Sequence, residues 1–269
     1  MSAFVRTARI IFSVAVCCSA AFADMHPSRS SPVAEPYDAQ GLPESKSADV
    51  VNQQLALLSP ELTGPGQAPL RPAEPFDMPA KAVLPEELAA KWSDLQSRIL
   101  ADEKTIAACR SDDAACSPAA RRFLSFVELG SKNERRVQLG QINRAVNLAV
   151  RPASDWAQYG YADFWASPLQ TLTSGAGDCE DYAIVKYAAL RALGIAEADL
   201  RLIIVRDGKH QTDHAIVAVR DEHDWLILDN RTMAILNAED ARHYNPLFVL
   251  DQQATQTFAA AAVNLVINR

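Results

Sequence analysis

The 269-residue chain is predicted to fold as an α+β domain in which helices come first and an antiparallel sheet follows. Residues 85–150 repeat apolar side chains at helical spacing, whereas residues 200–229 consist of short β-branched, apolar runs separated by polar turns. Because helices and strands are segregated along the chain, a doubly wound parallel sheet is excluded. The length and the 49% hydrophobic content predict one globular domain with extensions.

The first 23 residues are predicted to be a signal peptide. Two arginines precede an apolar stretch at residues 10–21, and Ala21-Phe22-Ala23 fits a small-x-small cleavage site. The stretch is too short to span a bilayer comfortably. Retention as an anchor and lipidation of a signal-peptide cysteine are the alternatives. We expect a soluble mature protein, without stable membrane insertion, that is periplasmic or secreted.

Three further segments follow the signal peptide. Residues 24–84 are rich in proline, which cannot continue a helix or a central strand, so a flexible stalk is expected there. Residues 85–251 hold the folded domain. Residues 252–269 form an alanine-rich tail that is compatible with a helix or a strand.

Three helices are predicted at the start of the domain. The first begins near Pro85 and has an apolar face formed by Leu88, Trp92, Leu95 and Ile99. The second runs from Pro118 to about Gly130, and the third spans residues 138–150. An irregular, aromatic-rich connection follows them.

A fourth helix follows the glycine-rich sequence SGAGDC at residues 174–179. Asp178 takes the N-cap position, Cys179 lies at the helix start, and the helix ends near Gly194. Strands are predicted next, as an antiparallel meander over residues 200–205, 214–219 and 225–229. Residues 247–250 are expected to add an edge strand.

The cysteine count points to one special thiol. Cys17 and Cys18 leave with the signal peptide, and Cys109 and Cys116 close a short loop that favours a disulfide in an oxidising compartment. Cys179 is then left over. Such a thiol is either buried and inert or kept for its reactivity. At a helix start, unpaired amides favour the thiolate and also offer an oxyanion hole, so we favour reactivity.

A nucleophilic thiol needs a base, and His214 is the best candidate of the five histidines. It begins a strand whose following residues are apolar, whereas the other histidines fall in the stalk, in turns or in a charged stretch. The structural alternative is a strand-end histidine that only satisfies a hydrogen bond.

The base must be held in one tautomer, usually by a carboxylate. Asp229 ends the next strand of the predicted meander, and an adjacent antiparallel strand would bring it to His214. Asn230 is the alternative orienting residue, and an ordinary strand-terminating turn would explain the pair without any catalytic role.

The net charge of −7 bears on partners. A mildly acidic chain without a run of Lys and Arg lacks the electrostatic footprint that binds nucleic acid or an anionic membrane. We exclude both classes of partner.

The sequence resembles the bacterial transglutaminase-like cysteine proteinase family. The resemblance rests on GDCEDYAIVKYAALRALGI, DHAIVAV and WLILDNRT, and it covers roughly residues 85–251 but not the stalk. It implies the papain-like α+β fold of transglutaminases. It also carries the catalytic triad of the family onto Cys179, His214 and Asp229.

The resemblance further implies a biological setting. The best-understood members are calcium-dependent periplasmic proteases that cleave a large surface adhesin, release biofilm cells and are restrained by an inner-membrane receptor. Their calcium site maps here onto Asp178, Glu180 and Asp181. Acidic residues in a first helical turn are also ordinary helix stabilisation, so both interpretations stay open. No organic cofactor is implied.

The expected function is therefore that of an exported thiol peptidase that cleaves a cell-envelope or surface protein. Two alternatives remain from the sequence. One is amide transfer to an amine, as in true transglutaminases. The other is a non-catalytic binding module with the same fold.

Overall fold

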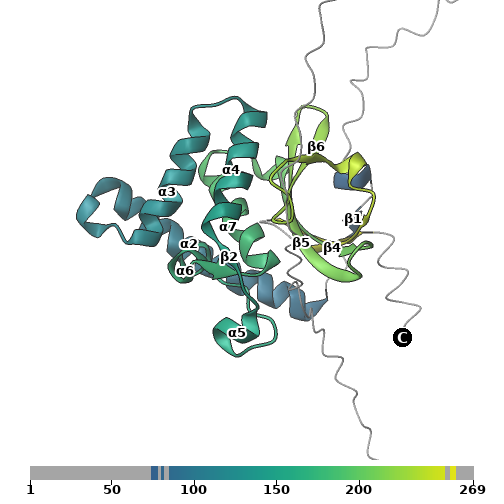
Figure 1. Ribbon diagram of the computed structural model, residues 1–269, viewed down its shortest axis with the longest axis horizontal. Coiled ribbons are helices and arrows are strands. Elements are labelled where there is room, and N and C mark those ends of the chain that lie inside the picture. The colour runs from purple at the N-terminus through teal and green to yellow at the C-terminus, as the bar shows by residue number, and fades with distance from the viewer. Residues whose placement is uncertain (1–73, 78–79, 82–84, 252–254, 259–269) are drawn as a thin grey trace, which may run out of the picture. The chain divides into compact units, whose positions relative to one another are not determined.

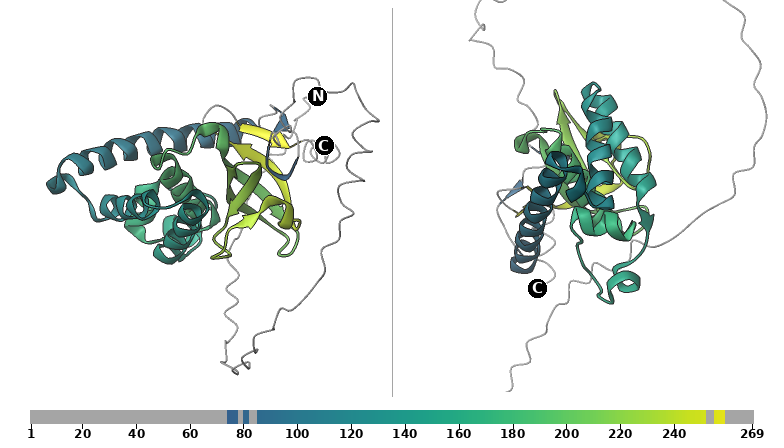
Figure 2. Two further views of the ribbon diagram at one scale, coloured as in Figure 1. Left: turned by 90° about the horizontal axis from the view of Figure 1, so that it is seen from above. Right: turned by 90° about the vertical axis from the view of Figure 1, so that its left-hand side faces the viewer.

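The computed structural model describes residues 74–77, 80–81, 85–251 and 255–258, all of which belong to one compact unit. The predicted signal peptide and residues 24–73 of the predicted stalk lie outside this description. Within it, helices gather on one side of an antiparallel sheet (Figures 1 and 2). The predicted α+β class is confirmed.

The four longer helices are α2 (Glu86–Ser111), α3 (Pro118–Ser131), α4 (Arg135–Ala149) and α7 (Cys179–Ala192). Helices α2, α4 and α7 contact the sheet, and α3 packs against the other helices. The predicted apolar face of α2 is buried at Trp92, Leu95 and Ile99. Helix α4 begins three residues earlier than expected. The shorter elements are η1 (Pro75–Asp77), η2 (Asp113–Ala115), α5 (Asp155–Tyr159), α6 (Pro168–Ser174), η3 (Glu197–Asp199) and η4 (Ala238–Asp240).

The sheet has the strand order β1-β9-β8-β4-β5-β6-β7, and every neighbouring pair in it is antiparallel. The predicted meander corresponds to β4, β5 and β6. The strands are β1 (Ala80–Lys81), β4 (Leu200–Asp207), β5 (Thr212–Asp221), β6 (Asp224–Leu228), β7 (Leu236–Asn237), β8 (Tyr244–Leu250) and β9 (Thr255–Phe258). A separate parallel pair joins β2 (Arg151–Pro152) to β3 (Ala176–Gly177).

Two expectations about the sheet margin need correction. An edge strand was expected over residues 247–250. The strand there, β8, is longer and is not at the edge, because β4 pairs with one side of it and β9 with the other. Residues assigned to the stalk also join the domain. Strand β1 pairs with β9, and Glu74 forms an ion pair with the buried Arg201.

Both faces of the central strands are buried. Leu202, Val217 and Leu228 pack against the helices, whereas their neighbours Ile203 and Ile216 face a second apolar core with Trp225, Ile227 and Ala238. Successive side chains point to opposite faces of a strand. This double burial explains why the strand sequences are continuously apolar instead of alternating.

The predicted disulfide between Cys109 and Cys116 is present and joins the end of α2 to the loop before α3. Within the described ranges, none of the helices combines the length and the apolar character that crossing a membrane would require.

Candidate active site

The start of α7 is built around two glycines. Gly175 ends α6 with a φ of 65°, a conformation that glycine adopts without strain. Gly177 lies against the first turn of α7, where an added Cβ would come within 2.6 Å of the Cβ of Asp181. The backbone therefore approaches this turn more closely than any side chain at position 177 would allow.

Cys179 is the first residue of α7, as predicted, and only 2% of it is exposed. Its thiol donates a hydrogen bond to Oε2 of Glu180 over 2.9 Å. Helix α7 packs against β4 and against β5, the strand that carries His214. The thiol thus lies at the positive end of a helix dipole in a buried setting.

His214 and Asp229 meet as predicted. Nε2 of His214 lies 2.8 Å from Oδ1 of Asp229, and both side chains are buried. The backbone amide of Arg231 donates to Oδ1 and the hydroxyl of Tyr244 donates to Oδ2. Asp229, rather than the alternative Asn230, is the residue whose side chain contacts the imidazole.

These contacts fix the protonation of the pair. Burial alone would raise the pKa of Asp229, but the hydrogen bond and charge of His214, with the donors from Arg231 and Tyr244, hold that pKa well below its usual range. An ionised carboxylate only accepts hydrogen bonds. Nε2 of His214 therefore carries a proton, and in the neutral ring Nδ1 is the basic nitrogen.

Two asparagines of α4 hold the turn that carries Asp229. The Nδ2 group of Asn147 donates to the backbone oxygens of Asp229 and Thr232, each over 2.9 Å. Asn143, one helical turn earlier, donates to the same oxygen of Thr232 over 2.9 Å. The position of the carboxylate is thus tied to the helical layer as well as to the sheet.

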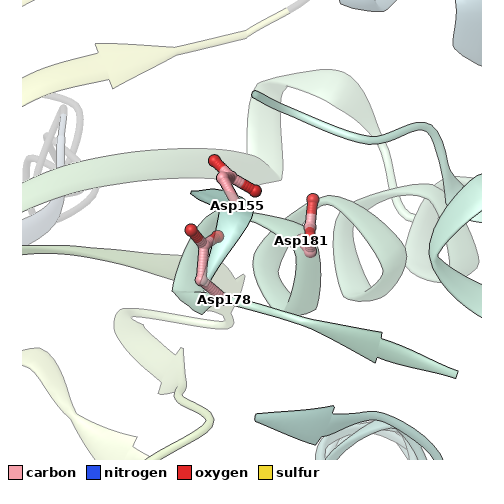
Figure 3. Close-up of side chains that lie close together, drawn as sticks. All are labelled: Asp155, Asp178 and Asp181. Atoms are coloured by element: carbon pink, nitrogen blue, oxygen red, sulfur yellow. The ribbon is translucent and has the colours of Figure 1, made fainter. Parts of the chain in front are cut away.

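Three aspartates gather at the start of α7 (Figure 3). One oxygen each of Asp155, Asp178 and Asp181 can be chosen so that all lie within 4.8 Å of one another. The parallel pairing of β2 with β3 brings Asp155 here, because Ala153 continues this pairing by donating to the backbone oxygen of Gly177. Asp155 and Asp181 are buried.

The ionised form is disfavoured at two of the three carboxylates, those of Asp155 and Asp181. Burial raises the pKa of Asp181 well above its ordinary value, and the charge of Asp178 adds to this effect. Burial also raises the pKa of Asp155. Within the described residues, Oδ1 of Asp155 and Oδ2 of Asp181 are buried and have no hydrogen-bond partner. Such orphaned oxygens are typical of a site that accepts a cation.

The cluster differs from the predicted set of Asp178, Glu180 and Asp181. Glu180 is not a member, because its carboxylate accepts from the thiol of Cys179 instead. Asp155 takes its place. Sequence reasoning missed Asp155 because it lies 23 residues before Asp178, in a segment that was predicted to be an irregular connection but that begins helix α5. Only the pairing of β2 with β3 brings the two aspartates together.

Lys186 is a buried charge that sequence reasoning also missed. It lies two turns after Cys179 on α7 and is 1% exposed. Burial lowers its pKa to about 7, and the negative charge of Asp229 acts in the opposite direction. An unfolded lysine titrates near pH 10.4, so between pH 7 and 10 the unfolded chain binds more protons than the folded one. Folding stability attributable to Lys186 therefore rises with pH in this window.

Lys186→Met is expected to remove this pH dependence. At pH 6 the variant lacks the cost of burying an ammonium, and its advantage in the free energy of unfolding should shrink by about 1.4 kcal/mol per pH unit above pH 7. Urea unfolding of both proteins at pH 6, 7, 8 and 9 measures this. Parallel profiles for the two proteins would show that Lys186 does not titrate in this range.

A family model described as bacterial transglutaminase-like cysteine proteinase matches residues 104–263, more than half of the chain. A search of curated proteins finds no match. Solved structures of Legionella pneumophila LapG are similar, each with a TM-score of 0.48. One is 22% identical and covers 62% of this chain and 93% of its own. The EGTA-treated and the calcium-bound structures are each 24% identical to this chain, and each match covers 58% of it. The matches cover 84% of the EGTA-treated chain and 86% of the calcium-bound chain.

Proposed function

The chain belongs to the bacterial transglutaminase-like cysteine proteinase family and is a cysteine peptidase, and we propose that Cys179, His214 and Asp229 are its catalytic triad. One observation carries this proposal. The buried hydrogen bond of 2.8 Å joins His214 of β5 to Asp229, which directly follows β6. Helix α7, which begins with Cys179, packs against β5. The substrate is a polypeptide.

In the proposed reaction the thiol proton passes to Nδ1 of His214, while Asp229 stabilises the resulting imidazolium. The thiolate attacks the carbonyl carbon of the scissile peptide bond, and amides at the start of α7 stabilise the oxyanion. When the intermediate collapses, the imidazolium gives its proton to the leaving amine and a thioester remains on Cys179. His214 then takes a proton from water as the hydroxide attacks the thioester, and it returns that proton to the sulfur of Cys179 when the acid leaves.

We further propose that Asp155, Asp178 and Asp181 bind calcium. Hard cations prefer carboxylate oxygens, and ligands 2.3–2.6 Å from one ion span at most about 5 Å, which the 4.8 Å limit of this cluster satisfies. The two orphaned oxygens of Asp155 and Asp181 support the same assignment. Calcium would supply positive charge beside Cys179 and offset the carboxylate field that otherwise disfavours a thiolate.

The proposed place of action is outside the cytoplasm. The predicted signal peptide and the Cys109–Cys116 disulfide support export to an oxidising compartment. The proposed substrate is a cell-envelope or surface protein, with an adhesin and control of biofilm release as the specific case that the family resemblance suggests. An inner-membrane regulatory receptor is the corresponding partner.

A calcium-controlled cleavage assay tests this function. The purified protein is incubated with envelope proteins of the source cell, and new protein N-termini are labelled and sequenced. We expect new termini in calcium, and at least about 10-fold fewer with a chelator or with Asp181→Asn, because the uncompensated carboxylates oppose the thiolate. Asp94→Asn, at an exposed carboxylate on α2, is the matched control and should cleave like the wild type.

Other outcomes of this assay contradict the proposal. Incorporation of a labelled amine into glutamine without new termini would indicate amide transfer. Neither product, with retained binding of an envelope protein, would indicate a binding module. Equal cleavage in calcium and in chelator would overturn the calcium assignment alone.

A further inference from the structure

The second carboxylate oxygen of Asp229 has a dedicated donor. Oδ1 accepts from His214 and from the backbone of Arg231, whereas Oδ2 accepts from the hydroxyl of Tyr244. Asp229 is only 2% exposed, so its oxygens depend on protein donors. The hydroxyl of Tyr244 is a side-chain contact that the triad chemistry does not itself require.

Tyr244 reaches this position from a different strand. It is the first residue of β8, is paired with Asp207 of β4, and is 5% exposed. Its ring lies 5.7 Å from the ring of His214 and 4.1 Å from that of His243, measured between centroids. The tyrosine thus contacts both members of the His214–Asp229 pair, one by packing and one by a hydrogen bond.

The direction of the Tyr244 hydrogen bond is fixed. Burial and the charge of Asp229 raise the pKa of Tyr244, so its hydroxyl stays protonated and acts as a donor throughout the neutral range. A carboxylate held on both oxygens cannot rotate about its χ2 angle without breaking one of these bonds. Donation to Oδ2 also withdraws charge from the carboxylate, which keeps the shared proton on the imidazole.

We propose that Tyr244 is a positioning residue of the peptidase, whose hydroxyl orients the Asp229 carboxylate so that Oδ1 faces Nε2 of His214. This inference rests on the proposed triad. Tyr244 does not touch the substrate or the reacting thiol in this scheme. Its effect on the reaction passes through the orientation and tautomer of His214.

Tyr244→Phe tests the proposal because it keeps the ring and removes only the hydroxyl. We expect kcat to fall about 10-fold and KM to change less than about two-fold. This is the size of effect expected when one charge-assisted hydrogen bond, here that of Tyr244 to Asp229, no longer supports the base His214. We also expect the downfield proton resonance of Nε2 of His214, identified by its absence in His214→Ala, to shift or broaden. Tyr187→Phe, which removes the hydroxyl of another buried tyrosine of the core, is the matched control.

The outcomes separate positioning from simple packing. Fluorotyrosine at position 244 retains a donating hydroxyl. If Tyr244→Phe loses activity because this hydroxyl no longer orients Asp229, fluorotyrosine should return both kcat and the His214 proton resonance to the wild-type values. Unchanged kcat and an unchanged resonance in Tyr244→Phe would overturn the proposal, as would equal losses in Tyr187→Phe. If the wild type cleaves nothing, the proposed function fails, whereas the resonance still decides whether Tyr244 orients the pair.

Discussion

Cys179→Ala is expected to abolish peptide cleavage, lowering kcat/KM by at least about 10⁴-fold. The variant has no atom that can form the thioester, and no other described thiol can substitute because Cys109 and Cys116 are joined in a disulfide. The side chain is small and buried, so the fold should survive. Cleavage is measured by the appearance of new N-termini, and folding by urea unfolding and amide spectra.

Cys179→Ser is the partner experiment for this prediction. It keeps a hydroxyl of similar size at the start of α7, but an alcohol is a much weaker nucleophile than a thiolate. We expect its activity to lie close to that of Cys179→Ala. Cleavage by Cys179→Ala at a rate comparable with the wild type would mean that another group performs the chemistry.

Asp229→Asn is expected to lower kcat by about 10²- to 10⁴-fold with a small change in KM. The amide is neutral and no longer stabilises the imidazolium. If its NH₂ group faces Nε2, the imidazole must accept there and carry its proton on Nδ1, which is the wrong nitrogen for a base. Steady-state kinetics on the substrate identified by N-terminal sequencing measures the loss.

Asp224→Asn is the control for this second prediction. Asp224 is the first residue of β6, the strand that precedes Asp229, and its exposed carboxylate pairs with Arg136 on the surface. The same chemical change at this position should leave kcat within about two-fold of the wild type, because exposed ion pairs contribute little. Equal kcat for Asp229→Asn and the wild type would remove Asp229 from the proposed triad.

Local sequence signals predicted most of the fold. The stripe through Trp92, Leu95 and Ile99 predicted a helix with one buried face, and the glycines before Cys179 predicted the start of α7. These signals work because they depend on neighbours within a few residues. The place of β8 inside the sheet was not predictable in this way, since its outer partner β9 follows a segment without strand signals.

The same difference between local and long-range contacts decides which site residues were predicted. His214 and Asp229 were found because successive strands of a meander lie side by side, so sequence order predicts the contact. Asp155 and Tyr244 were missed because pairing between segments far apart in sequence brings them to the site. Glu180 was predicted as a metal ligand, but in the structure its carboxylate accepts from the thiol of Cys179 and the cluster of carboxylates consists of Asp155, Asp178 and Asp181.

The burial of Lys186 was also not predictable from the sequence. A lysine in an alanine-rich helix is ordinarily solvent-exposed, and only the packing of α7 between α4 and the sheet buries it. Its charge then lies in the field of Asp229. No local pattern distinguishes such a lysine from a surface one.

Covalent capture of the reaction intermediate tests most directly whether Cys179 is a nucleophile activated by His214. The wild type and His214→Ala are mixed with the cleaved substrate, quenched in acid within the first turnovers and digested for mass spectrometry. We expect a thioester to the N-terminal fragment of the substrate on the peptide containing Cys179, present in the wild type and absent in His214→Ala. Rapid cleavage without an adduct on Cys179 in either protein, together with activity in Cys179→Ala, would contradict this role of Cys179.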